Sequence, residues 1–311
     1  MTGAAGFLGS HLSERLLAGG HEVVGIDAFT GFYARRLKER NLAALRVARG
    51  FDLYERDVLD GGLCDLLRGA EVACHLAGRP GVRTGGAAAF EAANVGATRA
   101  LVRAAASAGL TRVVLASSSS VYGACSGPVA EDAPLAPLSP YGHSKRRAEL
   151  VAADLAGKLG IELVRLRYFT VYGPRQRPDM AFARFVAAAL DGGAMPLLGG
   201  GAQRRDFTYV ADACEATALA LERGPAGAVY NVAGGRSVAL ADALALLGER
   251  LGREPAFEHR AADGREPRAT EADLTLAARE LGWAPRVGLV EGIECQLAHA
   301  GAELEDLAGW A

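Results

Sequence analysis

The chain has 311 residues, which is enough for about two domains. Hydrophobic residues make up 50% of the chain and charged residues 23%, a balance that excludes an intrinsically disordered protein. Its 34 Lys and Arg residues nearly balance 36 Asp and Glu residues, and the resulting net charge of −2 excludes nucleic acid as the main partner.

Cysteine usage and apolar run length bear on the cellular compartment. The five cysteines are scattered, form no CxxC pair and are odd in number, which excludes a complete internal disulfide framework and favours reduced cytosolic thiols. No apolar run reaches the roughly 18 residues of a membrane span, and no signal peptide opens the chain. We therefore expect a cytoplasmic protein with no membrane partner. The histidines lack the spacing of metal ligands, so we expect no metal site.

Strand-like and helix-like segments alternate up to about residue 175. The expected strands are short, rich in Val and Leu and typical of buried parallel strands; they cover residues 22–26, 52–56, 72–76, 112–116 and 163–167. The expected helices include residues 10–18, 95–108 and 144–159. This alternation predicts an α/β fold with a doubly wound parallel sheet of the Rossmann type.

The pattern changes after residue 175. We expect helices at 180–190, 240–251 and 274–281, a strand at 228–232, and a loop at 192–201 because that stretch holds five glycines. The chain is therefore predicted to form a sheet domain over residues 1–174, with returning segments at about 206–235, and a smaller domain over residues 175–311.

A glycine-rich loop stands at the start of the chain. Gly3, Gly6 and Gly9 form a GxxGxxG pattern, which lets the backbone approach a pyrophosphate at the N-terminus of the next helix. The pattern alone is equally compatible with an ordinary tight turn. Asp27 strengthens it, because it follows the first expected strand, 27 − 9 = 18 residues beyond Gly9, where an acidic residue binds the adenosine ribose hydroxyls. A carboxylate there repels a 2′-phosphate and so favours NAD over NADP.

The glycine loop lacks the strand that a dinucleotide-binding sheet places directly before it. Only Met1 and Thr2 precede Gly3, so we expect the natural product to carry a further strand of about five residues upstream. After the next expected strand, Asp57 and Val58 are candidates for the adenine edge of the site, although Asp57 fits a helix cap equally well.

Two polar motifs predict catalytic groups. Tyr141 and Lys145 form a YxxxK pair, which on a helix brings the ammonium near the phenol, favours the phenolate and lowers the pKa of the tyrosine. Four serines at 117–120 follow the expected strand at 112–116, at the edge where such sheets bind ligands, so one of their hydroxyls can hydrogen-bond a reacting oxygen. The structural alternatives are a solvated helix face and a polar turn.

These three motifs and two others resemble, in the same order, those of the extended short-chain dehydrogenase/reductase family, specifically its nucleotide-sugar epimerase/dehydratase group. The matching segments are TGAAGFLGSH at 2–11, SSSSVYG at 117–123, YGHSK at 141–145, RYFTVYGP at 167–174 and RDFTYVAD at 205–212. The resemblance implies an NAD-dependent enzyme with a Rossmann domain and a C-terminal domain that binds a nucleotide sugar. It also accounts for the missing strand, because family members have an apolar strand at that place.

The resemblance assigns roles to individual residues. It implies that Ser118 and Tyr141 are catalytic, with Tyr141 as the base, and that Lys145 holds the nicotinamide ribose. Arg205 is implied to bind the substrate diphosphate, whereas the family's second phosphate-binding arginine is missing from its usual pattern and Arg265 is a substitute. The predicted NAD contacts are Gly3, Gly6, Phe7, Leu8, Gly9, Asp27, Asp57, Val58, Leu76, Ala77, Gly78, Tyr141, Lys145 and Tyr168.

The resemblance also implies a reaction. Tyr141 removes the proton of a sugar 4-hydroxyl while hydride passes from C4 to NAD, and the 4-keto sugar rotates and takes the hydride back on its other face. Similar dehydratases carry Asp-Glu directly after the catalytic hydroxyl residue, and similar decarboxylases carry Glu at the position of Ser120. This chain has Ser119 and Ser120 there, which favours 4-epimerisation.

The segment at 169–181 is most similar to that of 4-epimerases acting on UDP-glucuronate. The similarity implies that Ser118, Ser119, Ser120 and Thr170 surround the C6 carboxylate of the sugar and that Arg177 fixes it. Hydroxyls and a guanidinium suit such an anion. Related 4-epimerases for UDP-glucose or UDP-N-acetylglucosamine share parts of this segment, and Arg177 is then a structural loop residue.

Two further alternatives and one partner remain. A nucleotide-sugar 4,6-dehydratase or reductase would release a 4-keto product or turn over cofactor. A non-catalytic dinucleotide sensor would not need the Ser, Tyr and Lys set that this chain retains. Apolar helical stripes at 101–108 and 150–159 are similar to the helices through which such enzymes form dimers, so we expect a homodimer, although the stripes fit ordinary core as well.

Overall fold

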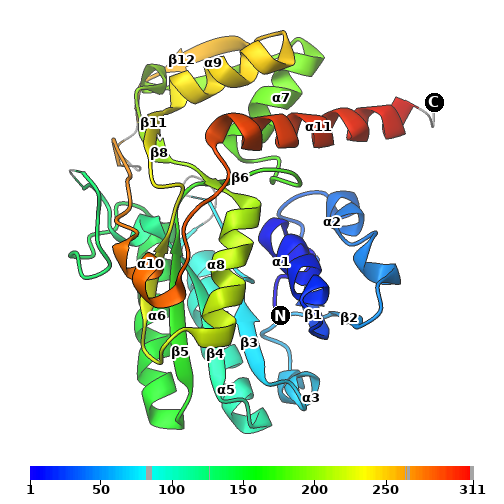
Figure 1. Cartoon of the computed structure of the whole chain (residues 1–311), viewed down its shortest axis with the longest axis vertical. Helices are drawn as coiled ribbons and strands as arrows, with labels where there is room; N and C mark the ends of the chain where they lie inside the picture. The colour runs from blue at the N-terminus through cyan, green and yellow to red at the C-terminus, as the bar shows by residue number, and fades with distance from the viewer. Residues whose placement is uncertain (82–85, 126, 263, 265–266, 309–311) are drawn as a thin grey trace.

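A computed structural model describes residues 1–81, 86–125, 127–262, 264 and 267–308 of the chain, and a parallel sheet forms its centre (Figure 1). The six strands confirm the doubly wound α/β fold, and each lies within two residues of its predicted position. Across the sheet they are β2 (Phe51–Glu55), β1 (Val23–Asp27), β3 (Val72–His75), β4 (Arg112–Ser118), β5 (Glu162–Tyr168) and β10 (Val229–Val232).

Two residues join β1 to β3. Thr2 forms parallel bridges with Ile26 and with His75. The amide of Ile26 donates a hydrogen bond to the carbonyl of Met1 (2.8 Å), and the amide of Thr2 donates to the carbonyl of Cys74 (3.0 Å). Met1 and Thr2 therefore lie in the central place of the sheet, directly before the glycine loop, where a strand is expected.

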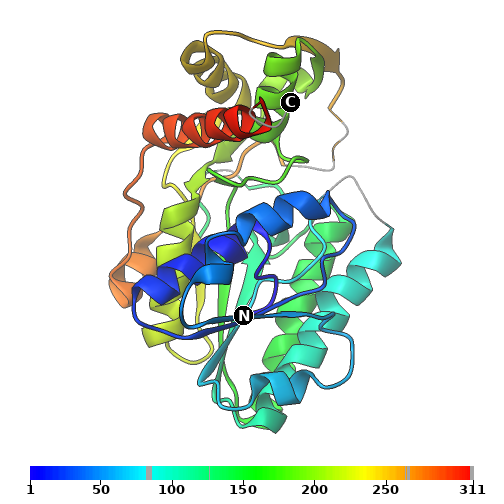
Figure 2. The same cartoon turned by 90° about the vertical axis from the view of Figure 1, so that its right-hand side faces the viewer.

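Helices cover both faces of the sheet, because the strands bury side chains on both sides. In β4, Val113 and Leu115 pack into one core cluster, whereas Val114 and Ala116 pack into another. The two layers are visible in Figures 1 and 2. The first cluster contains α3 (Leu63–Leu67), α5 (Ala97–Ala108) and α6 (Pro140–Leu159); the second contains α1 (Phe7–Ala18) and α8 (Val210–Arg223). Short connecting helices are α2 (Arg35–Asn41), η1 (Leu45–Val47), α4 (Ala87–Phe90) and η2 (Glu91–Gly96).

The later part of the chain forms a second body above the carboxyl ends of the sheet strands, as Figures 1 and 2 show. Its core is apolar and aromatic, with Phe182, Phe185 and Leu247 fully buried. Its elements are β6 (Val171–Tyr172), α7 (Ala181–Asp191), β7 (Ala194–Leu198), η4 (Gly199–Gly201), β8 (Arg204–Asp206), β9 (Thr208–Tyr209), β11 (Ser237–Ala239), α9 (Leu240–Leu251), β12 (Ala256–Arg260) and α11 (Leu289–Ala308). The helix α10 (Thr275–Leu281) instead packs against α8 and β10, beside the sheet (Figure 1).

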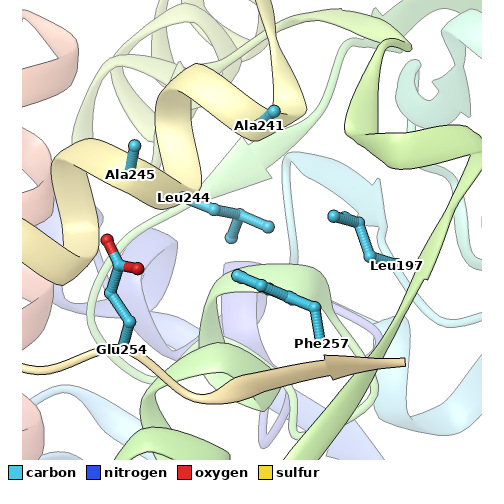
Figure 3. Close-up of a pocket in the computed structure, with 6 residues that line it drawn as sticks. All are labelled: Leu197, Ala241, Leu244, Ala245, Glu254 and Phe257. Carbon is cyan, nitrogen blue, oxygen red and sulfur yellow. The ribbon is translucent and has the colours of Figure 1, made fainter. Parts of the chain in front are cut away.

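The loop predicted at 192–201 is wrong in its middle. This stretch contains β7, which pairs in parallel with β12. The glycines on either side of β7 favour a loop, and the strand forms because it pairs with β12, which lies far along the sequence. A small pocket lies between this strand pair and α9, and Figure 3 shows Leu244 and Phe257 pointing into it. Its lining is apolar apart from Glu254, so it lacks the convergent polar groups of a catalytic site.

Candidate active site

The glycine loop packs so tightly that side chains are excluded from it. A Cβ on Gly9 would overlap the carbonyl oxygen of Gly3, and a Cβ on Gly3, whose φ is +74°, would lie 2.8 Å from the amide nitrogen of Ala77. The loop leads into α1, whose first turn holds no acidic residue and whose N-cap residue, Gly6, has no side chain. The first amide groups of α1 therefore fit a pyrophosphate, which is the group that the sequence predicts here. Phe7 and Leu8 begin this helix.

Asp27 ends β1 beside the glycine loop. Its carboxylate accepts hydrogen bonds from the amides of Ala5 (3.1 Å) and Phe29 (2.8 Å) and from the ammonium of Lys38 (3.1 Å). The side chains of Asp27 and Lys38 are both buried. This position suits the predicted contact with an adenosine ribose. Lys38 is a neighbour that the sequence analysis missed, because it lies on α2, a helix that was not predicted.

Asp57 and Val58 follow β2, and Asp57 lies in a turn and does not cap a helix, because the next helix, α3, begins at Leu63. The Asp57 carboxylate accepts a hydrogen bond from the amide of Leu59 (2.9 Å), as in a turn-forming residue. Val58 is buried in the core. A contact of either residue with the cofactor stays a prediction.

The predicted cofactor segment after β3 lies against the catalytic helix. Leu76 and Ala77 lie beside Thr2 in space, because the amide of Ala77 donates a hydrogen bond to the Thr2 hydroxyl (3.2 Å). A Cβ on Gly78 would lie 2.8 Å from Asn94 Oδ1 and 3.6 Å from Lys145 Nζ. Only a glycine therefore leaves Asn94 in place, and the segment connects the glycine loop with Lys145.

The three predicted catalytic residues come together where β4 ends and α6 begins. Ser118 is the last residue of β4, and Tyr141 and Lys145 lie in the first turns of α6. This helix begins at Pro140, earlier than predicted, because the Ser139 hydroxyl caps it by accepting a hydrogen bond from the amide of Gly142 (3.1 Å). Lys145 Nζ donates to the carbonyl of Ala116 (2.9 Å), which anchors the ammonium at the end of the same strand.

Burial dominates the electrostatics of this group. It raises the pKa of Tyr141, while a hydrogen bond with Ser118 and the positive charge of Arg177 act in the opposite direction. The expected lowering of the Tyr141 pKa is therefore wrong for this structure, because desolvation of the phenolate outweighs the charges around it. Burial also lowers the pKa of Lys145 to about 8, and the carboxylate of Glu149 partly offsets that effect.

A buried ionic network, here called the floor, lies beneath the serine run. It consists of Ser117, Glu149, Arg167, Tyr122 and Asn231. Arg167 donates to both carboxylate oxygens of Glu149 (3.0 and 2.8 Å), and the Ser117 hydroxyl donates to the same carboxylate (2.5 Å). Arg167 also donates to the Tyr122 hydroxyl (2.9 Å), which donates to the side-chain carbonyl of Asn231 (2.7 Å). The floor joins β4, β5, α6 and β10, and it includes the neighbour of Ser118 in β4 and the residue one helical turn after Lys145 in α6.

The remaining serines form a hydroxyl cluster above the floor. Ser119 begins a short 3-10 helix, η3 (Ser119–Val121), and the amide of Ser120 donates to the Ser118 hydroxyl (3.2 Å). Ser119 and Ser120 are half-buried, as is Thr170 at the start of the next loop. A narrow pocket that includes Phe169 in its lining opens against Ser119. Within the run, Ser118 is hydrogen-bonded to Tyr141 and Ser119 lines the pocket, and a contact of Ser119 or Ser120 with a substrate stays a prediction.

Arg177 reaches the site from the loop between β6 and α7. Its guanidinium forms an ion pair with Asp179, with Nε donating to Oδ1 (2.9 Å) and Nη2 donating to Oδ2 (3.1 Å). The guanidinium also lies over the Phe32 ring, 5.9 Å from its centre, and its charge acts on Tyr141. The structure thus brings this predicted substrate residue close to the catalytic tyrosine. Arg177 and Asp179 are called the rim below.

Three other predictions have different outcomes. Arg205 donates to the carbonyls of Arg204 (2.8 Å) and Pro267 (3.0 Å), so its contact with a diphosphate stays a prediction. Tyr168 is buried, and its hydroxyl is hydrogen-bonded to that of Thr217 (2.7 Å), which leaves only its ring for the predicted cofactor contact. Arg265 lies outside the described residues.

Among the described residues no cluster of His, Cys, Asp and Glu is arranged to hold a metal, and none of the helices is both long and apolar enough to span a membrane.

Comparisons with known proteins agree with this geometry. Residues 1–233 match the NAD dependent epimerase/dehydratase family. The chain is 38% identical over 304 residues to an uncharacterized UDP-glucose epimerase, YtcB, of Bacillus subtilis, which covers 96% of both chains. It is 33% identical over 306 residues to a dTDP-glucose 4,6-dehydratase of Streptomyces griseus, covering 96% of this chain and 92% of that one.

A solved structure is similar over nearly the whole chain. The UDP-glucuronic acid 4-epimerase of Bacillus cereus, in complex with UDP-glucuronic acid and NAD, superposes with a TM-score of 0.93 at 38% identity, covering 97% of this chain and 98% of that one. The close packing of the glycine loop and the positions of Asp27 and the Gly78 segment fit the NAD contacts predicted for them, which stay a prediction. The chain is an enzyme of the NAD dependent epimerase/dehydratase family, and NAD is its cofactor.

Proposed function

We propose that the enzyme inverts C4 of a UDP-sugar, and that its substrate pair is UDP-glucuronate and UDP-galacturonate. One observation supports the proposal most: Tyr141 is hydrogen-bonded to Ser118, the first of three consecutive hydroxyl residues, and is also acted on by the positive charge of Arg177. Positive charge together with hydroxyl donors beside the base suits a sugar whose C6 is a carboxylate. The similarity to the B. cereus enzyme supports the same assignment.

The chain's own residues supply acid–base chemistry at the sugar 4-oxygen. Tyr141 takes the proton of the 4-hydroxyl, and Ser118, hydrogen-bonded to it, orients that oxygen. Lys145 places an ammonium at the end of β4 and holds the nicotinamide ribose when the cofactor is present. NAD, when bound, accepts the hydride of C4 and returns it. Ser119 and Ser120 offer no acid for a 4,6-elimination, which disfavours the dehydratase reaction.

The second candidate is a 4-epimerase of a neutral sugar, UDP-glucose or UDP-N-acetylglucosamine. The similarity to YtcB favours it, at the same identity as that to the glucuronate enzyme. The hydroxyl cluster also suits a C6 hydroxyl, and Arg177 already has a carboxylate partner in Asp179. The two candidates share the chemistry at C4 and differ only in what contacts C6.

A product assay separates these candidates. The NAD-loaded protein is incubated with UDP-glucuronate, UDP-glucose or UDP-N-acetylglucosamine, and proton NMR follows the anomeric signals. We expect UDP-galacturonate without net reduction of NAD, and a loss of about 10²- to 10⁴-fold in rate for Tyr141→Phe when the variant is assayed with saturating NAD. Conversion of only a neutral sugar would leave the C4 chemistry standing and overturn the substrate assignment. A 4-keto product or accumulating reduced cofactor would contradict epimerisation.

We further propose that the enzyme works as a homodimer in the cytoplasm. All five cysteines are free thiols, which suits a reducing compartment. Leu150 on α6 is 59% exposed, whereas Leu101, Val102 and Ala105 of the α5 stripe are buried within the chain. The α5 stripe is therefore core, and an interface would use the outer face of α6. Light scattering after gel filtration measures the mass, and a Leu150→Arg variant that stays dimeric would contradict this interface.

A further inference from the structure

The ion pair of the rim has the geometry in which an arginine binds a substrate carboxylate. Both carboxylate oxygens of Asp179 are engaged, one by Nε and one by Nη2 of Arg177, at 2.9 and 3.1 Å. Two parallel N–H···O bonds of this kind are the preferred mode of carboxylate recognition by a guanidinium. The place where a sugar carboxylate would bind Arg177 is thus already taken by a carboxylate of the chain itself.

We propose that Asp179 acts as an internal competitor for Arg177 and thereby determines how strongly the enzyme prefers acidic over neutral UDP-sugars. The inference rests on the proposed function, because it assigns a specificity role at the same site. An acidic sugar takes the guanidinium from Asp179, whereas a neutral sugar leaves the pair closed and Arg177 neutralised.

The rim pair is accessible enough to exchange partners. The Asp179 side chain is 37% exposed and that of Arg177 is 21% exposed. When Asp179 leaves Arg177, its carboxylate can be hydrated, so opening the pair does not strand a buried charge. Exchange of one carboxylate for another also keeps the charge around Arg177 constant, since each partner neutralises the guanidinium.

Arg177 does not depend on Asp179 alone for its position, because its guanidinium also contacts an aromatic ring. Its guanidinium lies over Phe32, and the guanidinium of Arg79 lies over the same ring at 5.6 Å. A guanidinium that lies over an aromatic ring is attracted to the face of that ring and keeps N–H groups for a new acceptor. In this proposal Phe32 helps to hold the charge in place, while Asp179 determines whether the charge is available.

The backbone of this loop is also held independently of the rim pair. The Gln296 side chain on α11 accepts a hydrogen bond from the amide of Gly173 (3.1 Å) and donates to the Gln176 side chain (3.0 Å). The amide of Met180 donates to the carbonyl of Arg177 (3.1 Å). A substitution at Asp179 therefore removes the competing charge without releasing the loop.

The Asp179→Asn variant tests the proposal, because asparagine keeps one oxygen for Arg177 Nε and removes the negative charge. NAD-loaded protein in the Tyr141→Phe background, which does not consume substrate, is titrated calorimetrically with UDP-glucuronate and with UDP-glucose. We expect Asp179→Asn to tighten UDP-glucuronate about threefold to tenfold and to leave UDP-glucose unchanged. In the active background the gain should appear in KM for the acidic sugar rather than in kcat.

The matched control is Glu258→Gln. Glu258 pairs with Arg260 across the same two-residue spacing, but on the exposed strand β12, so its loss should leave both affinities unchanged. An unchanged or smaller ratio of acidic to neutral affinity in Asp179→Asn would overturn the proposal. Failure of the wild-type enzyme to convert any UDP-sugar would contradict the proposed function instead. The ratio of the affinities for UDP-glucuronate and UDP-glucose would still decide the role of Asp179.

Discussion

Two arginine–carboxylate pairs belong to the candidate active site, one in the floor and one in the rim. Both are bidentate, with N···O distances between 2.8 and 3.1 Å. The side chains of Arg167 and Glu149 are 4% and 3% exposed, whereas those of Arg177 and Asp179 are 21% and 37% exposed. The same chemical pair is thus buried in the floor and partly exposed to solvent in the rim.

Burial alone separates the two roles. In the floor, removal of one partner leaves a charge without water or a counter-charge, which is strongly unfavourable. In the rim, water replaces the lost partner, so the pair contributes little to folding and is free to serve binding. A site that contains both kinds of pair would have a rigid buried network and, at its edge, a positive charge whose partner could change.

The largest expected effect comes from breaking the floor. Glu149→Gln leaves Arg167 charged and without its carboxylate, and it weakens the hydrogen bond from Ser117, so the free energy of unfolding should fall by about 3–5 kcal/mol. Urea denaturation measures this change. Asp154→Asn on the same helix breaks an exposed pair with Lys158 and should change stability by less than about 1 kcal/mol. Equal losses of stability in the two variants would contradict the claim that the floor pair is stabilising because it is buried.

A smaller effect concerns the pH dependence of activity. The pKa of Lys145 is lowered to about 8, so its ammonium is present below that pH and is lost above it. We expect kcat/KM to decline as the pH rises through about 8. Because Glu149 raises this pKa, Glu149→Gln should move the decline to lower pH by up to about one unit. A decline that moved to higher pH, or that also shifted in Asp154→Asn, would contradict the coupling between Glu149 and Lys145.

The smallest effect is expected at the rim. Asp179→Asn should change the free energy of unfolding by less than about 1 kcal/mol, because its charge is partly hydrated and the loop has other anchors. Thermal and urea denaturation of this variant beside Glu149→Gln give the contrast directly. A loss as large as that of the floor variant would show that the rim is structural and does not exchange partners.

Much of the fold was predictable from the sequence, because its strands carry a local signal. Runs such as 112–116 are apolar and bounded by polar residues, and burial on both faces makes that pattern visible without knowledge of neighbours. β7 was missed because it is short, lies among glycines and depends on pairing with β12. α2 was missed because only two of its residues, Lys38 and Asn41, are buried.

The candidate catalytic residues could be located from sequence motifs, but their supporting partners could not. Ser118, Tyr141 and Lys145 stand in motifs at the end of a strand and on one helix, and the structure brings them together. Their partners come from separate elements: Arg167 lies 18 residues beyond Glu149 on β5, and the spacing of the two gives no sign of a pair. Glu149 itself stands one helical turn after Lys145, which is the one signal that the sequence did offer.

The predicted NAD site has a consequence for local opening, because its parts lie on two strands of the sheet. Asp27 ends β1, whereas Gly78 follows β3. A dinucleotide that contacted both residues would bridge the two strands, so NAD binding is expected to slow the exchange of amide hydrogens in β1 and β3 with solvent.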